Sequence, residues 1–520
     1  MAGKSAAALA LAVSALALTM PALADAHVAT AAPGDAQAPG ARGWISQKLL
    51  DYVADDMTSL VVHSISHMHI PDESGEEHSI QYEFNNFAVK GVGLAPSLRF
   101  VAGQGLSISI AQIQATITCN WKYREKHRPH IPHGSGTADI HIDSGTRADG
   151  VLVPGVDATS HPTICLSSLR VNVDLGKITI HGSLLDWLYK ELIKLVKGKI
   201  QHSVADGVSN AVSGFVTDDL AKKLAALPLQ LPLALSPPFD VALFDVSFDA
   251  LEVPTADHLL ASVRGAVLSR NASDPAYPVP PLPLPATPPG SFAEHMLSLT
   301  LNEWVLNSAA WLFYSKSLLA VDVAPSDVPP SSPLQLNTDS LLLLAPNLTA
   351  SYPHANLTLH VSAAAPPTVH FDPNNRSHFF VHSDARLRFD VLTPTGPVDA
   401  FTLGAPLNFS ATVSVSDASP QAATARVDVL SVTPLTVVES SVGHVHTHGV
   451  SSALRLLLDL GAIPRINAVL GAGMPIPPVD GVSFERLALT IDDGALTLRT
   501  DLSYSPTETR RRAAQLLSGA

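Results

Sequence analysis

The stretch LSISIAQIQATITCNWKY, residues 106–123, alternates apolar and polar side chains with one interruption. Leu106, Ile108 and Ile110 share one face of an extended chain, and from Ile113 onward the alternation continues one residue out of phase. A period of two is typical of a half-buried strand, and a phase slip indicates a β-bulge that bends it. We therefore predict one long, strongly curved antiparallel strand, too long for a sandwich of short strands.

Two amphipathic segments interrupt a series of similar strands in the first half of the chain. Residues 45–65 and residues 183–216 carry apolar side chains three and four positions apart, with Ser183 as the candidate N-cap of the second segment. Helices of this length beside bent strands would lie along a sheet and close it. The pattern predicts an α+β fold.

A proline-rich segment, SDPAYPVPPLPLPATPPG at residues 273–290, divides the chain. Such a segment favours an extended polyproline conformation and indicates a semi-rigid linker, whereas an SH3-type ligand would suit a cytosolic signalling chain better. Residues 291–505 then repeat the mixture of long strands and helices found in residues 43–272. We expect a tandem of two similar barrels.

The amino-terminal residues 1–26 are typical of a signal peptide, with Lys4, an apolar run and the small-residue sequence ALADA. Residues 27–42 are of low complexity and residues 506–520 form a tail. We expect a secreted, extracellular protein; a retained signal anchor is the alternative. Five N-glycosylation sequons fit an exported chain, at Asn271, Asn347, Asn356, Asn375 and Asn408.

The composition limits the partners. The net charge is -14 and only 15% of the residues are charged, against 46% hydrophobic residues, so we expect no nucleic-acid partner and much apolar surface facing a core or a ligand. Cys119 and Cys165 are the only cysteines. An even count permits one disulfide, and two free thiols are the alternative.

Several motifs resemble one known family in their order. They are ISQKLLDYVADDMTSLVVHSISHMHIPD from residue 45, the Trp-Lys pair in NWKYREK, PTICLSSLRVNV, the proline-rich linker, LSLTLNEWVLNSAAWLFY and IPRINAVLGAGMPIPPVDGV. The chain is similar here, from about residue 45 to residue 505, to the bactericidal permeability-increasing, lipopolysaccharide-binding and lipid-transfer proteins. The resemblance implies two elongated barrels of highly twisted antiparallel sheet wrapped round long helices, arranged as a boomerang and joined by a central sheet and the linker.

The resemblance also implies an apolar tunnel in each barrel for lipid acyl chains. The candidates in the first barrel have ordinary core packing as their alternative, since core and tunnel use the same residue types. These candidates are Ile45, Leu49, Tyr52, Val53, Leu184, Trp187, Leu188, Leu192 and Leu195.

Family members that bind lipopolysaccharide have a cationic loop at the tip of the first barrel. The matching residues here are Trp121, Lys122, Tyr123, Arg124, Lys126 and Arg128. Cations bind phosphate oxygens and aromatic rings settle at a lipid surface, while a solvated hairpin is the alternative. Mammalian members also tie a strand to the long helix with a disulfide, but this helix has no cysteine, so a Cys119–Cys165 bridge would join two strands.

We expect a non-enzymatic, monomeric protein without a cofactor that binds phospholipid, lipopolysaccharide or another glycolipid and contacts membrane surfaces transiently. Lipid transfer between membranes, or presentation of microbial lipid to a receptor, are alternatives. A rival from another class is a secreted hydrolase or metal-binding enzyme that uses His444, His446 and His448. No G-x-S-x-G or H-E-x-x-H motif supports such an enzyme.

Overall fold

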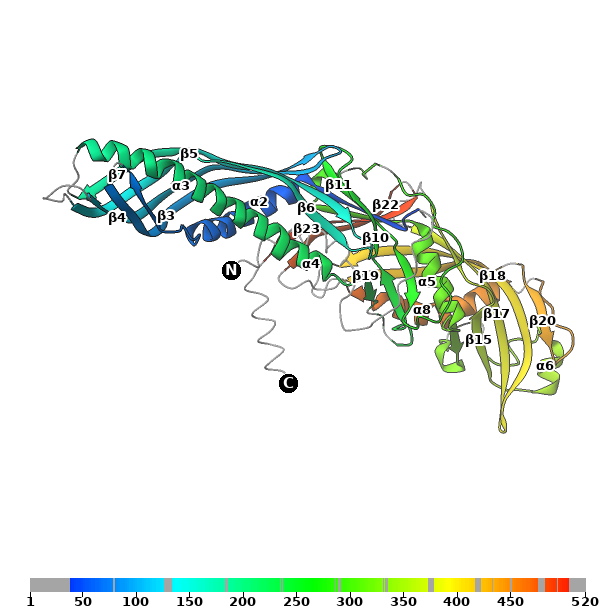
Figure 1. The fold of residues 1–520 in the computed structure, drawn as a ribbon. Coiled ribbons are helices and arrows are strands. Elements are labelled where there is room, and N and C mark those ends of the chain that lie inside the picture. Colours follow the sequence, from blue (N-terminus) through cyan, green and yellow to red (C-terminus); the bar gives the residue numbers. More distant parts are fainter. Residues whose placement is uncertain are drawn as a thin grey trace.

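The computed structural model describes residues 38–504 except 78–79, 126–132, 183–185, 234, 236, 286, 289, 291, 331, 333–334, 373–377, 417–421, 433, 449–450, 476–481 and 493. The expected signal peptide (residues 1–26) and tail (residues 506–520) lie outside the described residues. Figure 1 shows an elongated, bent molecule whose amino-terminal and carboxy-terminal halves lie toward opposite ends. The mixed α+β class with antiparallel sheets is confirmed.

A curled antiparallel sheet builds the amino-terminal half. Its order is β2-β3-β4-β5-β6, with β7 paired to β5. The sheet path is open at its ends, so it forms a curled half-barrel and not a closed barrel. The bounds are β2 Glu73–Glu77, β3 Ile80–Val101, β4 Gly105–Glu125, β5 His133–Val156, β6 Pro162–Asn172 and β7 Leu175–Gly182.

The predicted bulge lies in β4. The pairing of β4 with β5 shifts register between Ile110 and Ile113, where the alternation of the sequence changes phase. Ile110 and Ile113 both remain buried, because the extra residue returns the apolar side chains to the inner face. The slip therefore lets one strand curve without turning its apolar face to solvent.

Two long helices lie along this sheet (Figure 1). Helix α2 (Gln47–Ser66) follows β1 directly, and α3 (Asp186–Gly214) continues through a π-helical segment, η1 (Phe215–Leu220), into α4 (Ala221–Ala225). Val204, Val208 and Val212 recur every fourth residue of α3 and are buried against the sheet. Helical spacing of apolar residues thus sets which side of α3 packs inward.

A central sheet joins the two halves. Its order is β10-β11-β1-β13-β23-β22, so β1 of the amino-terminal half pairs with β13 of the carboxy-terminal half. The bounds are β1 Ala41–Ser46, β10 Phe248–Glu252, β11 His258–Val263, β13 Leu297–Leu301, β22 Val482–Asp492 and β23 Ala495–Tyr504. A small sheet of β8 (Gln230–Pro232), β9 (Ala242–Asp245) and β12 (Ala266–Ser269) lies in the order β12-β9-β8.

The proline-rich segment is bound to the central sheet and α5 through its backbone carbonyls. Arg42 donates hydrogen bonds to the carbonyls of Leu284 and Pro285 at 3.0 and 2.7 Å. The Trp304 indole donates to the Val279 carbonyl at 2.6 Å. Because proline has no N–H, a proline-rich segment forms backbone hydrogen bonds mainly through its carbonyl oxygens.

The carboxy-terminal half repeats this organisation. Helix α5 (Glu303–Ser315) follows β13 as α2 follows β1, and α7 (Ser451–Leu457) passes through a π-helical segment, η4 (Leu458–Ala462), into α8 (Ile463–Gly471). Its eight-stranded sheet has the order β14-β15-β17-β18-β19-β21, with β16 and β20 on β17 and β18. The bounds are β14 Ala320–Val323, β15 Leu357–Ala363, β16 Thr368–Phe371, β17 His378–Thr393, β18 Gly396–Ser416, β19 Ala422–Val432, β20 Thr436–Ser440 and β21 Met474–Pro475; short elements are η2 Phe292–Glu294, η3 Pro325–Asp327 and α6 Pro346–Ser351.

The two cysteines do not form the expected disulfide. Both are free thiols, Cys119 buried and Cys165 exposed. Cys119 is opposite Ala138 and Cys165 is opposite Val153, so the partners lie fifteen residues apart along β5, about 50 Å at the rise of a strand. A disulfide needs Cα atoms within about 7 Å, so the expectation of a strand-to-strand bridge is wrong.

Candidate functional site

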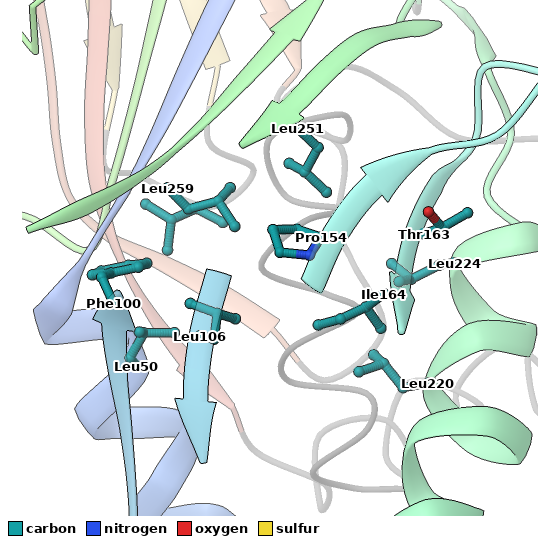
Figure 2. Close-up of a pocket in the computed structure, with 11 residues that line it drawn as sticks. Leu50, Phe100, Leu106, Pro154, Thr163, Ile164, Leu220, Leu224, Leu251 and Leu259 are labelled. Carbon is teal, nitrogen blue, oxygen red and sulfur yellow. The ribbon is translucent and has the colours of Figure 1, made fainter. Parts of the chain in front are cut away.

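An apolar cavity lies where the first curled sheet meets the central sheet (Figure 2). It is enclosed from several directions by β1 and α2, the β3–β4 turn, β5 and β6, the end of η1 with α4, and the central strands β10 and β11. Eleven residues line it: Ile45, Leu50, Phe100, Leu106, Pro154, Thr163, Ile164, Leu220, Leu224, Leu251 and Leu259. The site is therefore assembled from segments spread over more than two hundred residues of sequence.

Local sequence explains why each segment presents an apolar side chain here. Phe100 and Leu106 are paired across the β3–β4 turn and so point to the same face of the sheet. Leu220 and Leu224 are four residues apart, which places both on one face of the helical segment formed by η1 and α4. Figure 2 shows these groups pointing into one space.

The chemistry of the lining is that of a hydrocarbon site. The Thr163 hydroxyl is the one polar side-chain group among the eleven lining residues, and none of them is titratable. General acid or base catalysis needs a titratable group within hydrogen-bond reach of the substrate. The cavity is suited to hold apolar groups.

The cavity measures about 20 Å³, which is room for about one water molecule. An acyl chain is much larger than this volume. The π-helical segment η1 ends at Leu220, one of the lining residues. Insertions of this type in helices are frequent at functional sites, and this one ends beside the cavity.

The tunnel residues expected from the sequence are placed as follows. Ile45 lines the cavity, Leu49 and Val53 are buried in the surrounding core, and Tyr52 packs half-buried against that core. Leu184 lies outside the described residues, as do the side chains of four residues of α3: Trp187, Leu188, Leu192 and Leu195.

Sequence reasoning missed most of the lining. Leu50 is adjacent to the expected Leu49, and its position on the helix turns it toward the cavity. Leu220 and Leu224 carried a usable signal, since their spacing continues a helical pattern beyond residue 216. No local sequence pattern indicates that Leu251 and Leu259 line the cavity, because only the pairing of the central sheet brings them there.

The aromatic residues of the basic tip point inward. Trp121 and Tyr123 are 2% and 7% exposed and stack with ring centroids 6.0 Å apart. The Trp121 indole donates to the carbonyls of Thr137 and His181 at 3.1 and 3.2 Å. This differs from the expectation that both rings settle at a lipid surface, because they continue the inner-face alternation of β4 that begins at Ile113.

The described cations of the tip point outward. Lys122 and Arg124 are exposed on the outer face of β4, and Lys126 and Arg128 lie outside the described residues. The Lys122 ammonium lies 2.5 Å from a Glu83 carboxylate oxygen. That hydrogen bond, with a second from Asn85, lowers the pKa of the Glu83 carboxyl. Lys122 is therefore already partly neutralised.

Models of two domains of one family match most of the chain. The model of the LBP / BPI / CETP family, N-terminal domain, matches residues 49–220, and the C-terminal domain model matches residues 241–504. The chain belongs to the LBP / BPI / CETP family. The recognition made from the sequence motifs is confirmed.

Relatives of this LBP / BPI / CETP family chain extend over nearly its whole length. It is 25% identical to the lipopolysaccharide-binding protein of Homo sapiens, over 94% of this chain and 99% of the relative. It is 26% identical to the bactericidal permeability-increasing protein of Rattus norvegicus, over 89% and 93%. A crystal structure of lipopolysaccharide binding protein has a TM-score of 0.56 at 23% identity, covering 90% of this chain and 99% of that chain, and so shows the shared fold.

The histidine cluster of this family member lies in a loop after β20. His444 and His446 are exposed with ring centroids 4.5 Å apart, while Val445 between them is buried. Within the described part of the chain, no three His, Cys, Asp or Glu side chains come together as a metal site. The rival based on these histidines gains no support.

The sequons of this family member differ in exposure. Asn271, Asn347 and Asn356 are exposed, and Asn375 lies outside the described residues. Asn408 is half-buried and donates a hydrogen bond to the Ser431 hydroxyl at 2.8 Å. Among the helices that the structure describes, none is long and apolar enough to cross a bilayer.

Proposed function

We propose that this LBP / BPI / CETP family member is a secreted, non-enzymatic lipid-binding protein that holds acyl chains in the cavity of its amino-terminal half. The observation that carries the proposal is the lining of that cavity, which is apolar except for one hydroxyl. Burial of each methylene contributes about 0.8 kcal/mol, so a long acyl chain supplies enough free energy for tight binding. The names of the two relatives, which refer to lipopolysaccharide and to bacterial permeability, agree with a lipid ligand.

Loading requires the cavity to widen from its closed volume. In this proposal Leu220 and Leu224 move away from Leu50 and Ile164 as the end of the helix shifts, and the acyl chain takes their place. The π-helical segment before α4 supports this, since its hydrogen bonding already departs from that of a regular α-helix.

Headgroup recognition is assigned to the basic tip. Lys122 and Arg124 present cations on the outer face of β4, and Lys126 and Arg128 add two more in the sequence that follows. Cations of this kind make charge-assisted hydrogen bonds with phosphate oxygens. The ligand would be an anionic phospholipid or a phosphorylated glycolipid such as lipopolysaccharide. Trp121 and Tyr123 support the strand from within.

The remaining parts of the proposal concern the whole chain. Residues 1–26 direct export, residues 43–272 and 291–505 act as two lipid-binding units of curled sheet in a boomerang arrangement, and residues 273–290 link them. The protein works as a monomer, uses no cofactor and contacts membranes transiently. The pairing of β1 with β13 supports a rigid connection between the two units.

Native mass spectrometry of the protein purified from its own source, followed by lipid extraction, tests this proposal. We expect a bound lipid mass in the wild type and its loss in Leu50→Trp, because the larger side chain occupies the cavity. Leu343→Trp is the control, since Leu343 is 83% exposed. A wild-type protein without lipid, which also takes up none from vesicles, would reject the proposal. Exchange of fluorescent lipid between vesicles distinguishes transfer from capture.

A further inference from the structure

The amino end of α2 is bound to the carboxy-terminal half of the molecule. The Ser46 hydroxyl donates to the His295 carbonyl at 2.6 Å, and the Ser46 N–H donates to the Met296 carbonyl at 3.1 Å. Two residues later, the Lys48 ammonium donates to Asp501 of β23 at 2.8 Å. These contacts join residues more than two hundred positions apart in the sequence.

Asp501 is the centre of this contact. Its side chain is 9% exposed, and it accepts hydrogen bonds from the Met296 N–H at 2.9 Å and from Arg486 at 2.5 Å, in addition to Lys48. Burial alone would raise the pKa of the Asp501 carboxyl, but these three donors lower it. The carboxylate is therefore held in place by groups of its own half and offers one further interaction to α2.

The same end of α2 contributes to the cavity. Ile45 directly precedes Ser46, and Leu50 lies two residues after Lys48; both line the cavity. The anchored residues thus lie between two lining residues. A shift of the amino end of α2 would move both lining side chains relative to Leu220 and Leu224.

A second ion pair on α2 offers an internal comparison. Asp51 lies 2.6 Å from Arg99 of β3, but both side chains are more than half exposed, at 55% and 58%. This pair lies within the amino-terminal half. Exposed ion pairs contribute little because water screens them, whereas the partner of Lys48 is shielded.

We propose that Asp501 is a positioning residue for lipid entry. It binds Lys48 and so holds the amino end of α2 against the carboxy-terminal half. In this way the carboxy-terminal half restrains the opening of the cavity in the amino-terminal half. The inference rests on the proposed function and adds to it a coupling between the two halves. Asp501 touches no lipid in this scheme; it acts through Lys48 and the amino end of α2.

The test measures uptake and release of cis-parinaric acid, an 18-carbon fatty acid that fluoresces in apolar surroundings, by stopped flow. Lys48→Met removes the hydrogen bonds of Lys48 to Asp501 and to the Glu294 carbonyl, but Asp501 keeps its Arg486 and Met296 partners, so we expect the variant to fold. We expect both rates to rise about fivefold, which corresponds to about 1 kcal/mol. Lys48→Arg should restore the wild-type rates, and Arg99→Met should not change them.

Equal rates in Lys48→Met and Arg99→Met, within twofold, would overturn the inference. If the wild type binds no cis-parinaric acid, the coupling is judged by hydrogen exchange of the amides of residues 49–53, and the proposed function fails if the protein also takes up no lipid from vesicles. Faster exchange in Lys48→Met than in Arg99→Met supports the coupling, and equal exchange rejects it. The two proposals can therefore fail separately.

Discussion

Ile45 of β1 and Leu259 of β11 are directly opposite one another in the central sheet, and both side chains line the apolar cavity. The sheet that joins the two halves is therefore also one wall of the candidate lipid site. Ile45 is also opposite Leu297 of β13, so the strand that contributes to the cavity pairs directly with the carboxy-terminal half. Substitution of Leu259 therefore tests the packing of this wall.

Leu259→Ala should lower the free energy of unfolding by about 2 to 4 kcal/mol, because it removes buried methyl groups and enlarges an existing cavity. Urea denaturation measures the change. Leu343→Ala is the matched control and should change the free energy by less than about 0.5 kcal/mol, since Leu343 is 83% exposed. A Leu259→Ala protein as stable as this control would show that the site is not packed as described.

Replacing Lys122 and Arg124 together with Ser should weaken binding to phosphatidylglycerol vesicles at low salt by about 5- to 30-fold, at about 1 kcal/mol for each cation near an anionic surface. The loss should approach the lower value, because Lys122 already pairs with Glu83. Vesicle co-sedimentation measures the binding.

The control for the tip replaces Arg386 and Arg426, two exposed arginines of the carboxy-terminal sheet, with Ser. It removes the same charge from another surface and should leave vesicle binding unchanged. Equal effects of the two double variants would show that overall charge, and not the tip, attracts the lipid. The bound lipid should persist in both variants.

Stability should fall in mild acid because of His295. Burial lowers the pKa of this histidine, and the nearby Arg486 adds to the effect. The ordinary pKa of histidine is 6.5. Below pH 6.5 the unfolded chain binds a proton on this imidazole more readily than the folded protein does, so the free energy of unfolding decreases as pH falls. Above pH 6.5 this histidine does not change the free energy of unfolding.

Urea denaturation between pH 7.5 and pH 5.5 measures this dependence. His295→Gln should show a smaller decrease than the wild type, because the variant has no imidazole to protonate. His354→Gln, which removes a histidine with an 86% exposed side chain, should retain the wild-type decrease. Identical pH profiles for all three proteins would contradict the role of His295.

The two thiols should differ in reactivity. Burial, with the Asp139 carboxylate, raises the pKa of Cys119 to about 12, so almost no thiolate forms at pH 8, while Cys165 is exposed. Ellman's reagent should therefore titrate one thiol in the native protein and two after denaturation. The Cys165→Ser protein should react only when unfolded, and an absence of thiols in denatured wild type would indicate the disulfide that the structure lacks.

The amino-acid sequence by itself determined the local elements. The phase slip after Ile110 predicted the bulge of β4, because a strand with one buried face must keep its apolar residues on that face. Helical spacing predicted two long helices in the first half, and the order of the motifs identified the family. The alternation from Ile113 also predicts that Trp121 and Tyr123 point inward, although the neighbouring basic residues Lys122 and Arg124 favoured an exposed tip.

Tertiary structure alone decided which distant segments meet. The separation of Cys119 from Cys165 depends on their register along β5, and neither spacing nor composition reveals it. The cavity exists because the pairing of the central sheet brings Leu251 and Leu259 against Leu220 and Leu224. The Lys48–Asp501 contact likewise follows from the pairing of β1, β13 and β23. Such contacts depend on the pairing of remote strands, which the local pattern of a single sequence does not encode.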